Sequence, residues 1–286
     1  MLILFPAECF NNNRIEPDYA DEYETVCQFP YFKTLFFNFD EFIANRDIKL
    51  FPRDHYNGDC IYRGWMINPE KYKKLYKILL NAGIKLINTP DEYNNCHLFP
   101  SVLDMLAPYT PKSLCFEDSA FIDWDLVNGS FKKFMVKDYV KSVKGTVFPA
   151  FFNTPVKKDE MDRQILEFIR LRDDLFTNGI VLKEFVELKR YGEATNEYRA
   201  FFMNGQLLSL CRNSNQPSSS TFVPLDFVSK FSWLKSNYYT VDMAELTDGT
   251  WTVIETGDGQ VSGLSPNQCI HNYYNDIQNI LSKPSC

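Results

Sequence analysis

The segment from residue 181 to residue 255 decides how this chain is interpreted. It contains the strand-like runs VLKEFVE (181–187), NEYRAFF (196–202), YTVDMA (239–244) and WTVIETGDG (251–259). Each run is largely apolar, yet each holds charged residues inside it. A lone charged side chain inside a buried strand is costly unless it is paired or binds a ligand. Acidic and basic residues set together in this way indicate a polyanion bound with its metal ion, and nucleoside triphosphate with Mg²⁺ is the commonest ligand of that kind.

Two acidic residues in this segment predict the metal site. Asp242 and Glu255 lie on runs that are joined by the turn-forming pair Asp248-Gly249. Antiparallel pairing about that turn places the two carboxylates side by side, where like charges destabilise a sheet unless a cation lies between them. Mg²⁺ prefers hard oxygen ligands together with phosphate oxygens. The alternative is two exposed carboxylates on a polar face, which fits less well beside Val241 and Val253.

Two lysines occupy similar positions on separate predicted strands. Lys137 lies in FMVKDY (134–139), and Lys141 and Lys144 follow it in a polar loop that could cover bound phosphates. The alternative for Lys137 is a side chain that extends to solvent from an edge strand. Lys183 precedes an apparent hinge, whose backbone would contact an adenine edge while Glu184 accepts a hydrogen bond from the exocyclic amine. Buried lysines are rare without a partner, so the pair favours a nucleotide site.

The pattern of predicted elements places this segment in a larger α/β architecture. Up to about residue 117, strands alternate with helices, which predicts a parallel sheet covered on both faces. The strands are expected at 2–5, 33–39, 60–66 and 84–87, and the helices at 18–29 and from 68 to 82. Residues 118–286 are expected to form two α+β lobes. Their strands lie at 131–139 and 181–187 around a helix at 159–176, followed by strands joined at Asn204-Gly205 and Asp248-Gly249, and a last helix at 266–281.

Composition excludes several classes of protein. Of the 286 residues, 45% are hydrophobic and 23% charged, which are ordinary globular values. The net charge is −7, and no run of Lys and Arg residues forms a basic surface, so sequence-independent binding to nucleic acid is not expected. The eight cysteines contain no C-x-x-C spacing, which predicts reduced thiols in the cytoplasm. The apolar start is too short for a signal peptide, and no run has the length of a membrane span.

The ordered set of motifs resembles the ATP-grasp superfamily, and within it the clade named for two lysines and an arginine. The order is a strand lysine, a helix, Lys-Glu-Phe-Val (183–186), Glu-x-Arg (197–199), then a strand Asp and a strand Glu before a glycine-bearing turn. Residues 16–23, 61–66 and 97–100 are similar to the amino-terminal part of that clade. The resemblance covers nearly the whole chain and implies an ATP-grasp fold with an amino-terminal pre-ATP-grasp lobe at 1–117 and the ATP-grasp domain at 118–286.

The resemblance also implies roles for particular residues. ATP would lie between two lobes, with its phosphates on Lys137 and Lys183, and Arg199 would stabilise the transition state that leads to an acyl phosphate. The remaining nucleotide contacts would come from the hinge and the next strand: Glu184, Phe185 and Val186 at the adenine, and Glu197 at the ribose or metal. Asp242 and Glu255 would bind Mg²⁺. Many family members carry Glu-x-Asn at the last metal strand, whereas this chain has Glu255-Thr256-Gly257-Asp258, so either Asp258 supplies the missing oxygen or a second metal is held less tightly.

The implied function is a Mg²⁺- and ATP-dependent ligase that joins a carboxylate to an amine or thiol acceptor. A nucleotide-binding sensor or adaptor without catalysis is an alternative, as is a ligase with a macromolecular acceptor such as RNA or a peptide. Arg63 and Trp65 are candidate substrate residues that would line one pocket with Arg199, since arginine grips carboxylates through two hydrogen bonds. A structural ion pair is the alternative for Arg63. The three histidines, His55, His97 and His271, are expected to be structural or on the surface. The substrates and the oligomeric state are not specified by the sequence.

Overall fold

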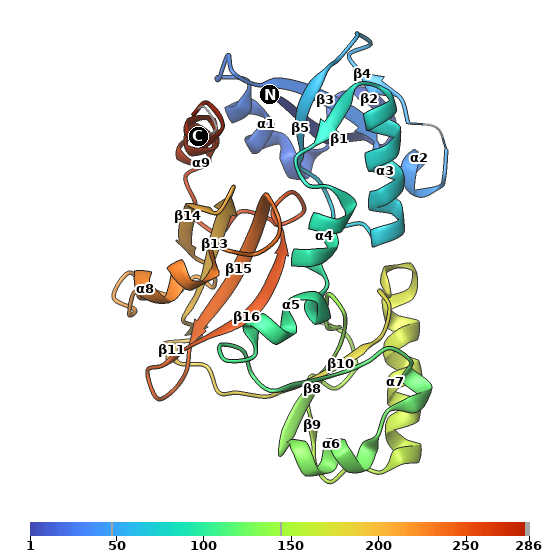
Figure 1. The fold of residues 1–286 in the computed structure, drawn as a ribbon, viewed down its shortest axis with the longest axis vertical. Helices are drawn as coiled ribbons and strands as arrows, with labels where there is room; N and C mark the ends of the chain where they lie inside the picture. Colours follow the sequence, from blue (N-terminus) through green and yellow to red (C-terminus); the bar gives the residue numbers. More distant parts are fainter. Residues whose placement is uncertain (47, 144, 284–286) are drawn as a thin grey trace.

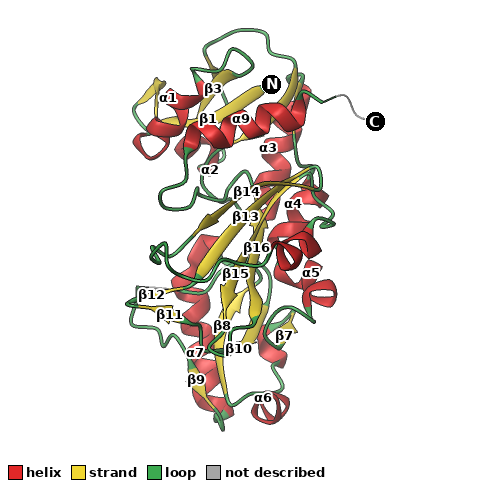
Figure 2. Cartoon of the chain, turned by 90° about the vertical axis from the view of Figure 1, so that its left-hand side faces the viewer, coloured by secondary structure: helices red, strands yellow, loops and turns green. Residues whose placement is uncertain are grey.

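The computed structural model describes residues 1–46, 48–143 and 145–283. The three larger sheets of the described residues follow one another along the long axis of the molecule (Figure 1). The amino-terminal sheet lies at one end, the sheet β14-β13-β15-β16 lies in the middle, and the sheet β7-β10-β8-β9 lies at the other end (Figure 2). The carboxy-terminal helix returns to the amino-terminal sheet, so the first strand and the last helix share one lobe.

The amino-terminal sheet confirms the predicted parallel arrangement. Its order is β4-β3-β1-β5-β6, and β1 runs parallel to β3 and β5. The short strand β2 pairs antiparallel with β1, and the short strand β4 pairs antiparallel with β3. The strands are β1 (Leu2–Glu8), β2 (Asn11–Ile15), β3 (Lys33–Asn38), β4 (Leu50–Phe51), β5 (Gly58–Tyr62) and β6 (Ile84–Leu86).

Helices cover both faces of this sheet, as its apolar pattern requires. Alternate residues of β1 point to opposite faces, so Ile3 and Phe5 pack in one core while Leu2 and Leu4 pack in the other. The first core includes residues of α1 (Ala20–Val26) and α9 (Ile270–Leu281). The second core includes residues of α2 (Phe39–Ile43) and α3 (Pro69–Asn81). Asn68 caps α3 by accepting a hydrogen bond from the Lys71 N–H, and Pro69 follows at the first helical position.

Two helices that the sequence analysis did not predict connect the lobes. The first, α4 (Pro90–His97), begins with a capping box in which Thr89 and Glu92 bond reciprocally. The second, α5 (Phe99–Leu106), follows after Leu98, whose extended backbone breaks the helical path. Together they bring His97 and Phe99 to the junction between the amino-terminal lobe and the rest of the chain.

The sheet at the far end is antiparallel and has the order β7-β10-β8-β9. Its strands are β7 (Ser113–Phe116), β8 (Lys133–Asp138), β9 (Phe152–Asn153) and β10 (Ile180–Glu184). A core shared with α6 (Trp124–Ser130) and α7 (Lys158–Arg172) packs against it. Because β7 pairs with β10, the chain enters this sheet before residue 117.

The middle sheet confirms the predicted hairpins. Asn204 and Gly205 both have positive φ, 50° and 73°, as a tight turn between β13 and β14 requires. Asp242 on β15 pairs directly with Glu255 on β16, and a register shift follows at Met243. The strands are β13 (Glu197–Met203), β14 (Gln206–Arg212), β15 (Tyr238–Glu245) and β16 (Trp251–Asp258), with β11 (Arg190–Tyr191) and β12 (Ala194–Thr195) paired beside them.

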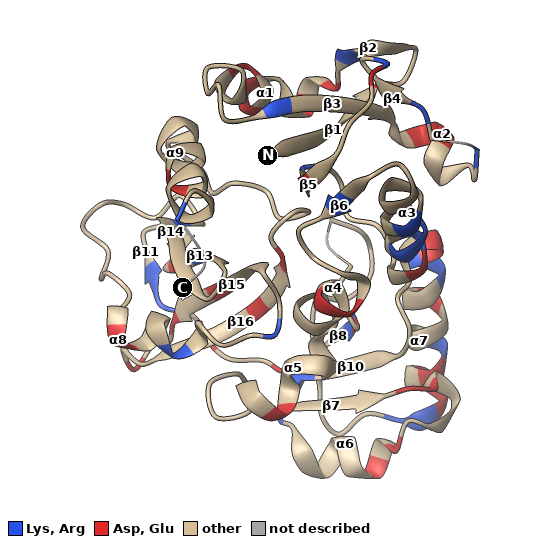
Figure 3. Ribbon diagram, turned by 45° about the horizontal axis from the view of Figure 1, so that its top comes forward, with Lys and Arg blue, Asp and Glu red and all other residues tan. Residues whose placement is uncertain are grey.

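The remaining elements are short: α8 (Leu225–Val228) and the 3₁₀ helices η1 (Pro17–Tyr19), η2 (Ser119–Phe121), η3 (Asp173–Leu175) and η4 (Ser229–Phe231). Lys and Arg are distributed over several elements and lie beside Asp and Glu on α3 and α7 (Figure 3). Within the described ranges, every helix is too short or too polar to cross a bilayer. The cysteines in these ranges are free thiols, and Cys286 lies outside them.

Candidate functional site

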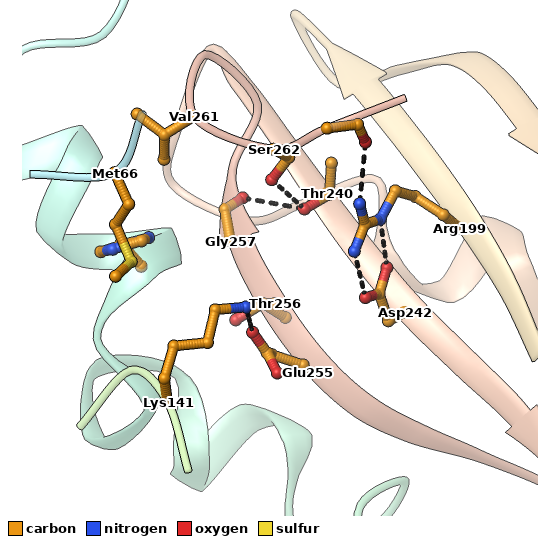
Figure 4. Close-up of a pocket in the computed structure, with 12 residues that line it drawn as sticks. Met66, Lys141, Arg199, Thr240, Asp242, Glu255, Thr256, Gly257, Val261 and Ser262 are labelled. Atoms are coloured by element: carbon orange, nitrogen blue, oxygen red, sulfur yellow. Dashed lines mark hydrogen bonds and ion pairs between the residues drawn. The ribbon is translucent and has the colours of Figure 1, made fainter. Parts of the chain in front are cut away.

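Three charged residues form a row across the middle sheet. Arg199 on β13 lies opposite Asp242 on β15, and Asp242 lies opposite Glu255 on β16. Arg199 donates through Nε and Nη2 to the two oxygens of Asp242, at 2.8 and 2.6 Å, and through Nη1 to the carbonyl of Gly263 at 2.8 Å (Figure 4). Such a two-point ion pair fixes the guanidinium plane and is among the stronger charge-assisted contacts. The row presents one cation and two carboxylates to the same side of the sheet.

Two lysines reach the end of this row, Lys137 on β8 of the far sheet and Lys141 in the loop that follows β8. Lys137 Nζ on β8 lies 3.7 Å from one oxygen of Glu255, and Lys141 binds the other oxygen. Burial opposes ionisation of Glu255, but Lys137 and Lys141 outweigh it and hold the pKa of this carboxyl down to about 2. Glu255 is therefore a carboxylate at any physiological pH. Lys144, the other lysine of the predicted loop, lies outside the described residues.

Lys137 and Lys183 face the same side of the far sheet. Lys137 pairs with Val181, so Lys183 lies diagonally across from it on the neighbouring strand. Their ammonium groups lie 5.9 and 4.7 Å from the centre of the Phe99 ring. Lys183 donates to Thr110 Oγ1 at 2.9 Å and to the carbonyl of Ile254 at 2.7 Å. Burial, and then the nearby Lys137, lower the pKa of Lys183 well below its usual value.

A cavity of about 160 Å³ opens beside the charged row. That volume suits a phosphoryl group with a neighbouring carboxylate and is small for a whole nucleotide. Figure 4 shows Lys141 beside Glu255, and Arg199 beside Asp242, at this cavity. The other lining residues come from the segment before α3, from α4 and from the strands and the loop after β16: Met66, His97, Thr240, Thr256, Gly257, Val261, Ser262 and Gly263.

Two buried polar groups at this cavity lack hydrogen-bond partners in the described ranges. They are Nδ1 of His97 and Oγ1 of Thr256. His97 is 5% exposed and Thr256 is 6% exposed. Burial, and then the charge of Lys141, lower the pKa of His97 to about 3, so its imidazole is neutral. The sequence predicts only a structural or surface role for His97. Its place in the cavity depends on the unpredicted helix α4, and no local sequence signal indicates it.

The predicted adenine hinge follows β10. Glu184, Phe185 and Val186 are partly buried, and regular strand pairing ends at Glu184. The Phe185 N–H donates to the carbonyl of Lys133 at 2.9 Å, and Lys133 Nζ lies 3.8 Å from the centre of the Phe185 ring. Glu197, expected at the ribose or metal, lies two residues before Arg199 on β13 and accepts a hydrogen bond from the Thr195 hydroxyl.

The structure places Asp258 outside the cavity. Its side chain is fully buried and accepts hydrogen bonds from Asn88 Nδ2 at 2.5 Å and from the Gln260 N–H at 2.9 Å. Burial raises the pKa of Asp258 to about 7. Gly257, which does line the cavity, has no side chain to offer a metal. Within the described part of the chain, no cluster of three or more His, Cys, Asp or Glu residues is positioned to hold a metal ion.

Arg63 and Trp65 do not share the cavity with Arg199, so the structure separates the three predicted substrate residues. Arg63 is 1% exposed; its Nε and Nη2 donate to Glu22 at 2.9 and 2.8 Å, and its Nη1 donates to the carbonyls of Gly259 and Ser262 at 2.7 and 3.0 Å. This arrangement matches the alternative of a structural ion pair, because every nitrogen of the guanidinium is engaged.

Trp65 lies in a neighbouring depression of about 340 Å³, which adjoins the cavity at Gly263. Its ring packs edge-on against Tyr19, with ring centres 5.6 Å apart. Three acidic residues contribute to the same lining: Asp18, Asp21 and Glu22.

Comparisons with known proteins bear on the family and the fold of this chain. A family model described as an ATP-grasp domain, family 3 of the clade named for two lysines and an arginine, matches residues 126–281. D-alanyl-alanine synthetase A from Vibrio cholerae O1 biovar eltor is 13% identical with a TM-score of 0.60, covering 98% of this chain and 98% of that one. The ATP-grasp ligase PsnB, complexed with a phosphomimetic variant of its minimal precursor, Mg and ADP, is 11% identical with a TM-score of 0.58, covering 96% of each chain.

The macrocyclase MdnC, bound with precursor peptide MdnA from Microcystis aeruginosa MRC, is 12% identical with a TM-score of 0.54, covering 99% of this chain and 100% of that one. At these identities the likeness to solved structures shows the fold alone. A search of curated protein sequences gave no match.

Proposed function

The chain belongs to the ATP-grasp family, in family 3 of the clade named for two lysines and an arginine, and we propose that it is a Mg²⁺- and ATP-dependent ligase that joins a carboxylate to an amine. The observation that carries this proposal is the row Arg199–Asp242–Glu255 beside Lys137 and Lys141 at one small cavity. Two adjacent carboxylates ringed by cations suit a metal ion that is bound together with phosphate oxygens. No covalent nucleophile is needed for such chemistry, which depends on positioning and charge neutralisation.

The donor set fits Mg²⁺. Asp242 and Glu255 are hard oxygen ligands in adjacent positions, and each is now paired with a side-chain cation. When nucleotide and metal bind, the two carboxylates would turn to the metal, which frees Arg199 and Lys141 for phosphate oxygens. Bound Mg²⁺ would neutralise charge on the phosphates. Asp258 has no part in this scheme, because its carboxyl group is committed to Asn88 and Gln260.

The other predicted residues have places in the same scheme. Lys137 and Lys183 would hold phosphate oxygens near the Phe99 ring, and the hinge at Glu184, Phe185 and Val186 would hold the adenine. Glu197 would lie at the ribose or metal. The donor carboxylate would attack the γ-phosphorus and displace ADP, and the acceptor amine would then attack the acyl carbon and displace phosphate. Arg199 would stabilise the negative charge that develops during both steps.

One observation favours a second candidate, a nucleotide-binding sensor or adaptor. The cavity offers two carboxylates, since Gly257 has no side chain and Asp258 is directed elsewhere. A site with fewer metal ligands can bind Mg²⁺ and ATP without rapid turnover.

Acceptors that are peptides are also included in the test below, because PsnB and MdnC are both known in complex with precursors.

The test is product screening with the purified protein. Pools of carboxylates and amines, including peptides, are incubated with ATP and Mg²⁺, and ADP release and new amide products are followed by enzyme coupling and mass spectrometry. The ligase proposal expects a product that disappears in Arg199→Met. Nucleotide binding by calorimetry without turnover in any pool would favour the sensor. Failure to bind Mg·ATP and Mg·ADP would overturn both candidates.

A further inference from the structure

The position of Lys141 in the pocket depends on a tight bend of the chain after β8. Lys141 lies in a loop, outside the helices and strands, and its ammonium reaches Glu255 on the middle sheet (Figure 4). β8 ends at Asp138, whose N–H donates to the carbonyl of Lys141 at 2.9 Å. A lysine side chain has several rotatable bonds and loses much rotamer freedom when its charge is fixed. The place of the ammonium therefore depends on how firmly the backbone of this loop is held.

The side chain of Asp138 holds this bend. Its Oδ1 accepts hydrogen bonds from the backbone N–H groups of Val140 at 2.7 Å and of Lys141 at 2.6 Å. Its Oδ2 accepts hydrogen bonds from Arg172 Nε at 2.8 Å and from the Thr177 N–H at 3.3 Å. The side chain of Asp138 is fully buried. A buried carboxylate is costly unless it is paired and hydrogen-bonded, and four donors satisfy this one.

Arg172 anchors this carboxylate to the end of α7. Arg172 is the last residue of that helix, and its side chain is 10% exposed. Its Nη2 donates to the carbonyl of Leu175 at 3.0 Å, so the guanidinium binds η3 as well as Asp138. α7 packs in the core of the far sheet. One chain of contacts therefore fixes the loop that carries Lys141 to a packed helix of that lobe.

The two oxygens of the Asp138 carboxylate bind two different segments. Oδ2 binds Arg172 and a backbone N–H of the far lobe, whereas Oδ1 binds backbone N–H groups of the loop. Neither residue of this ion pair is among the described residues that line the cavity. The pair Arg170–Glu167 on the same helix differs, because its side chains are 69% and 38% exposed and contact each other at the surface. Any influence of the Asp138–Arg172 pair on a ligand therefore passes through the loop that it holds.

We propose that Asp138, held by Arg172, is a positioning residue that fixes the backbone of Lys141, so that the ammonium of this lysine meets the phosphate oxygens of the nucleotide. The inference rests on the proposed function, in which Lys141 leaves Glu255 for phosphate. Asp138 itself contacts neither the nucleotide nor the metal. Its contribution is to order the loop before the ligand arrives, which lowers the entropy cost of binding.

The test is a double-mutant cycle on nucleotide affinity. The affinity for the non-hydrolysable ATP analogue adenylyl-imidodiphosphate with Mg²⁺ is measured by calorimetry in the unaltered protein, in Asp138→Asn, in Lys141→Met and in the double variant. Asp138→Asn keeps the volume but turns an N–H group toward other donors. We expect each single change to weaken binding about ten-fold. We expect the double variant to lose no more than about ten-fold, because without the ammonium there is nothing left to position.

The Lys141→Met background separates positioning from a structural role. A change that only loosened the fold would weaken binding whether or not Lys141 is present, and the double variant would then lose about a hundred-fold. Glu167→Gln removes the exposed ion pair of the same helix and is the matched control, which we expect to stay within about two-fold. Additive losses, or an unchanged affinity in Asp138→Asn or in Lys141→Met, overturn the inference and leave the proposed function standing.

Arg172→Lys replaces Asp138→Asn in the cycle if the latter does not fold. It keeps the positive charge, but an ammonium lacks the planar fork that binds Asp138 and Leu175 together. We expect a loss of about three-fold with Lys141 present and no loss in the Lys141→Met background. A loss in both backgrounds, or in neither, overturns the inference. Absence of nucleotide binding by the unaltered protein overturns the proposed function itself.

Discussion

The molecule contains two groups of ion pairs that differ in how deeply they are buried and in how fully their hydrogen bonds are satisfied. The junction cluster, Glu22, Arg63 and Tyr274, joins α1, the end of β5 and α9, and Arg63 also binds the loop after β16. Its arginine and glutamate side chains are 1% and 12% exposed. The pocket cluster is more open: Arg199, Asp242 and Glu255 are 18%, 16% and 22% exposed, and Lys141 is 43% exposed.

This difference separates structural charges from exchangeable ones. In the junction cluster every nitrogen of Arg63 binds an oxygen of the protein, and Tyr274 donates to Glu22 at 2.7 Å. A ligand would have to break several buried contacts to compete there. In the pocket cluster each carboxylate faces a cavity and is held by side chains that can turn away. In the sequence, the positive charge of Arg63 and of Arg199 does not tell the two residues apart. In the structure, the number of hydrogen bonds that each guanidinium makes to the protein distinguishes them.

The largest expected effect is on stability, from the junction cluster. Arg63→Met leaves Glu22 buried without its partner, and breaking a buried pair in this way costs about 3–5 kcal/mol. Urea unfolding followed by fluorescence measures the change. Arg199→Met is the matched control, and its loss should be nearer about 1 kcal/mol because Asp242 can be hydrated from the cavity. Equal losses in the two variants would remove the distinction drawn between the clusters.

The second prediction concerns turnover, which we expect to depend on Arg199 of the pocket cluster. Arg199→Met should lower the rate of product formation by about 10²–10³-fold, the usual cost of removing a group that stabilises transition-state charge. The rate is measured with the carboxylate and amine pair found by product screening. Arg199→Lys keeps the charge but not the two-point geometry, and we expect it to recover part of the rate. A rate within a few-fold of the original in Arg199→Met would contradict the assigned role.

The third prediction concerns the metal. Glu255→Gln should reduce the gain in ADP affinity that Mg²⁺ provides by at least about ten-fold, since it removes a hard oxygen charge from the site. Calorimetric titrations of ADP with Mg²⁺ and with EDTA give this gain directly. Asp258→Asn serves as the control and should leave the gain unchanged. Should Asp258→Asn lose the gain while Glu255→Gln keeps it, the metal assignment must move to Asp258.

The smallest expected effect is the pH dependence of Asp258. Burial raises the pKa of this carboxyl to about 7, above its value of about 4 in an unfolded chain. The folded state therefore binds the proton more tightly, and the stability it contributes is lost as pH rises through 7. Between pH 6 and pH 7.5, the unfolding free energy should fall by about 1 kcal/mol relative to Asp258→Asn. A constant difference between the two proteins over this range would count against the buried, protonated state.

The sequence predicted those parts of the site that depend on local pairing. Asp242 and Glu255 meet because a hairpin joins their strands, and Lys137 and Lys183 share a face because their strands are neighbours. Strand geometry could also have indicated the place of Asp258. Residues 255 and 258 are an odd number of positions apart, so on one strand they point to opposite faces.

Long-range packing explains what the sequence did not show. The partners of Arg63 lie on α1 and in the loop after β16, far away along the chain, and no local pattern indicates that they saturate the guanidinium. His97 reaches the cavity through α4, whose few apolar positions give a weak helical signal. The role of such residues depends on which lobes meet, and that is decided by packing of the whole molecule.

The central claim, that the pocket cluster exchanges its ion pairs for a metal and nucleotide, is tested most directly by crystallography with ADP and Mn²⁺. Mn²⁺ shares the oxygen preference of Mg²⁺ and gives an anomalous signal. We expect an anomalous peak at coordination distance from Asp242 and Glu255, with Lys141 moved from Glu255 to phosphate. Bound ADP with both ion pairs intact and no peak at these carboxylates would contradict the account.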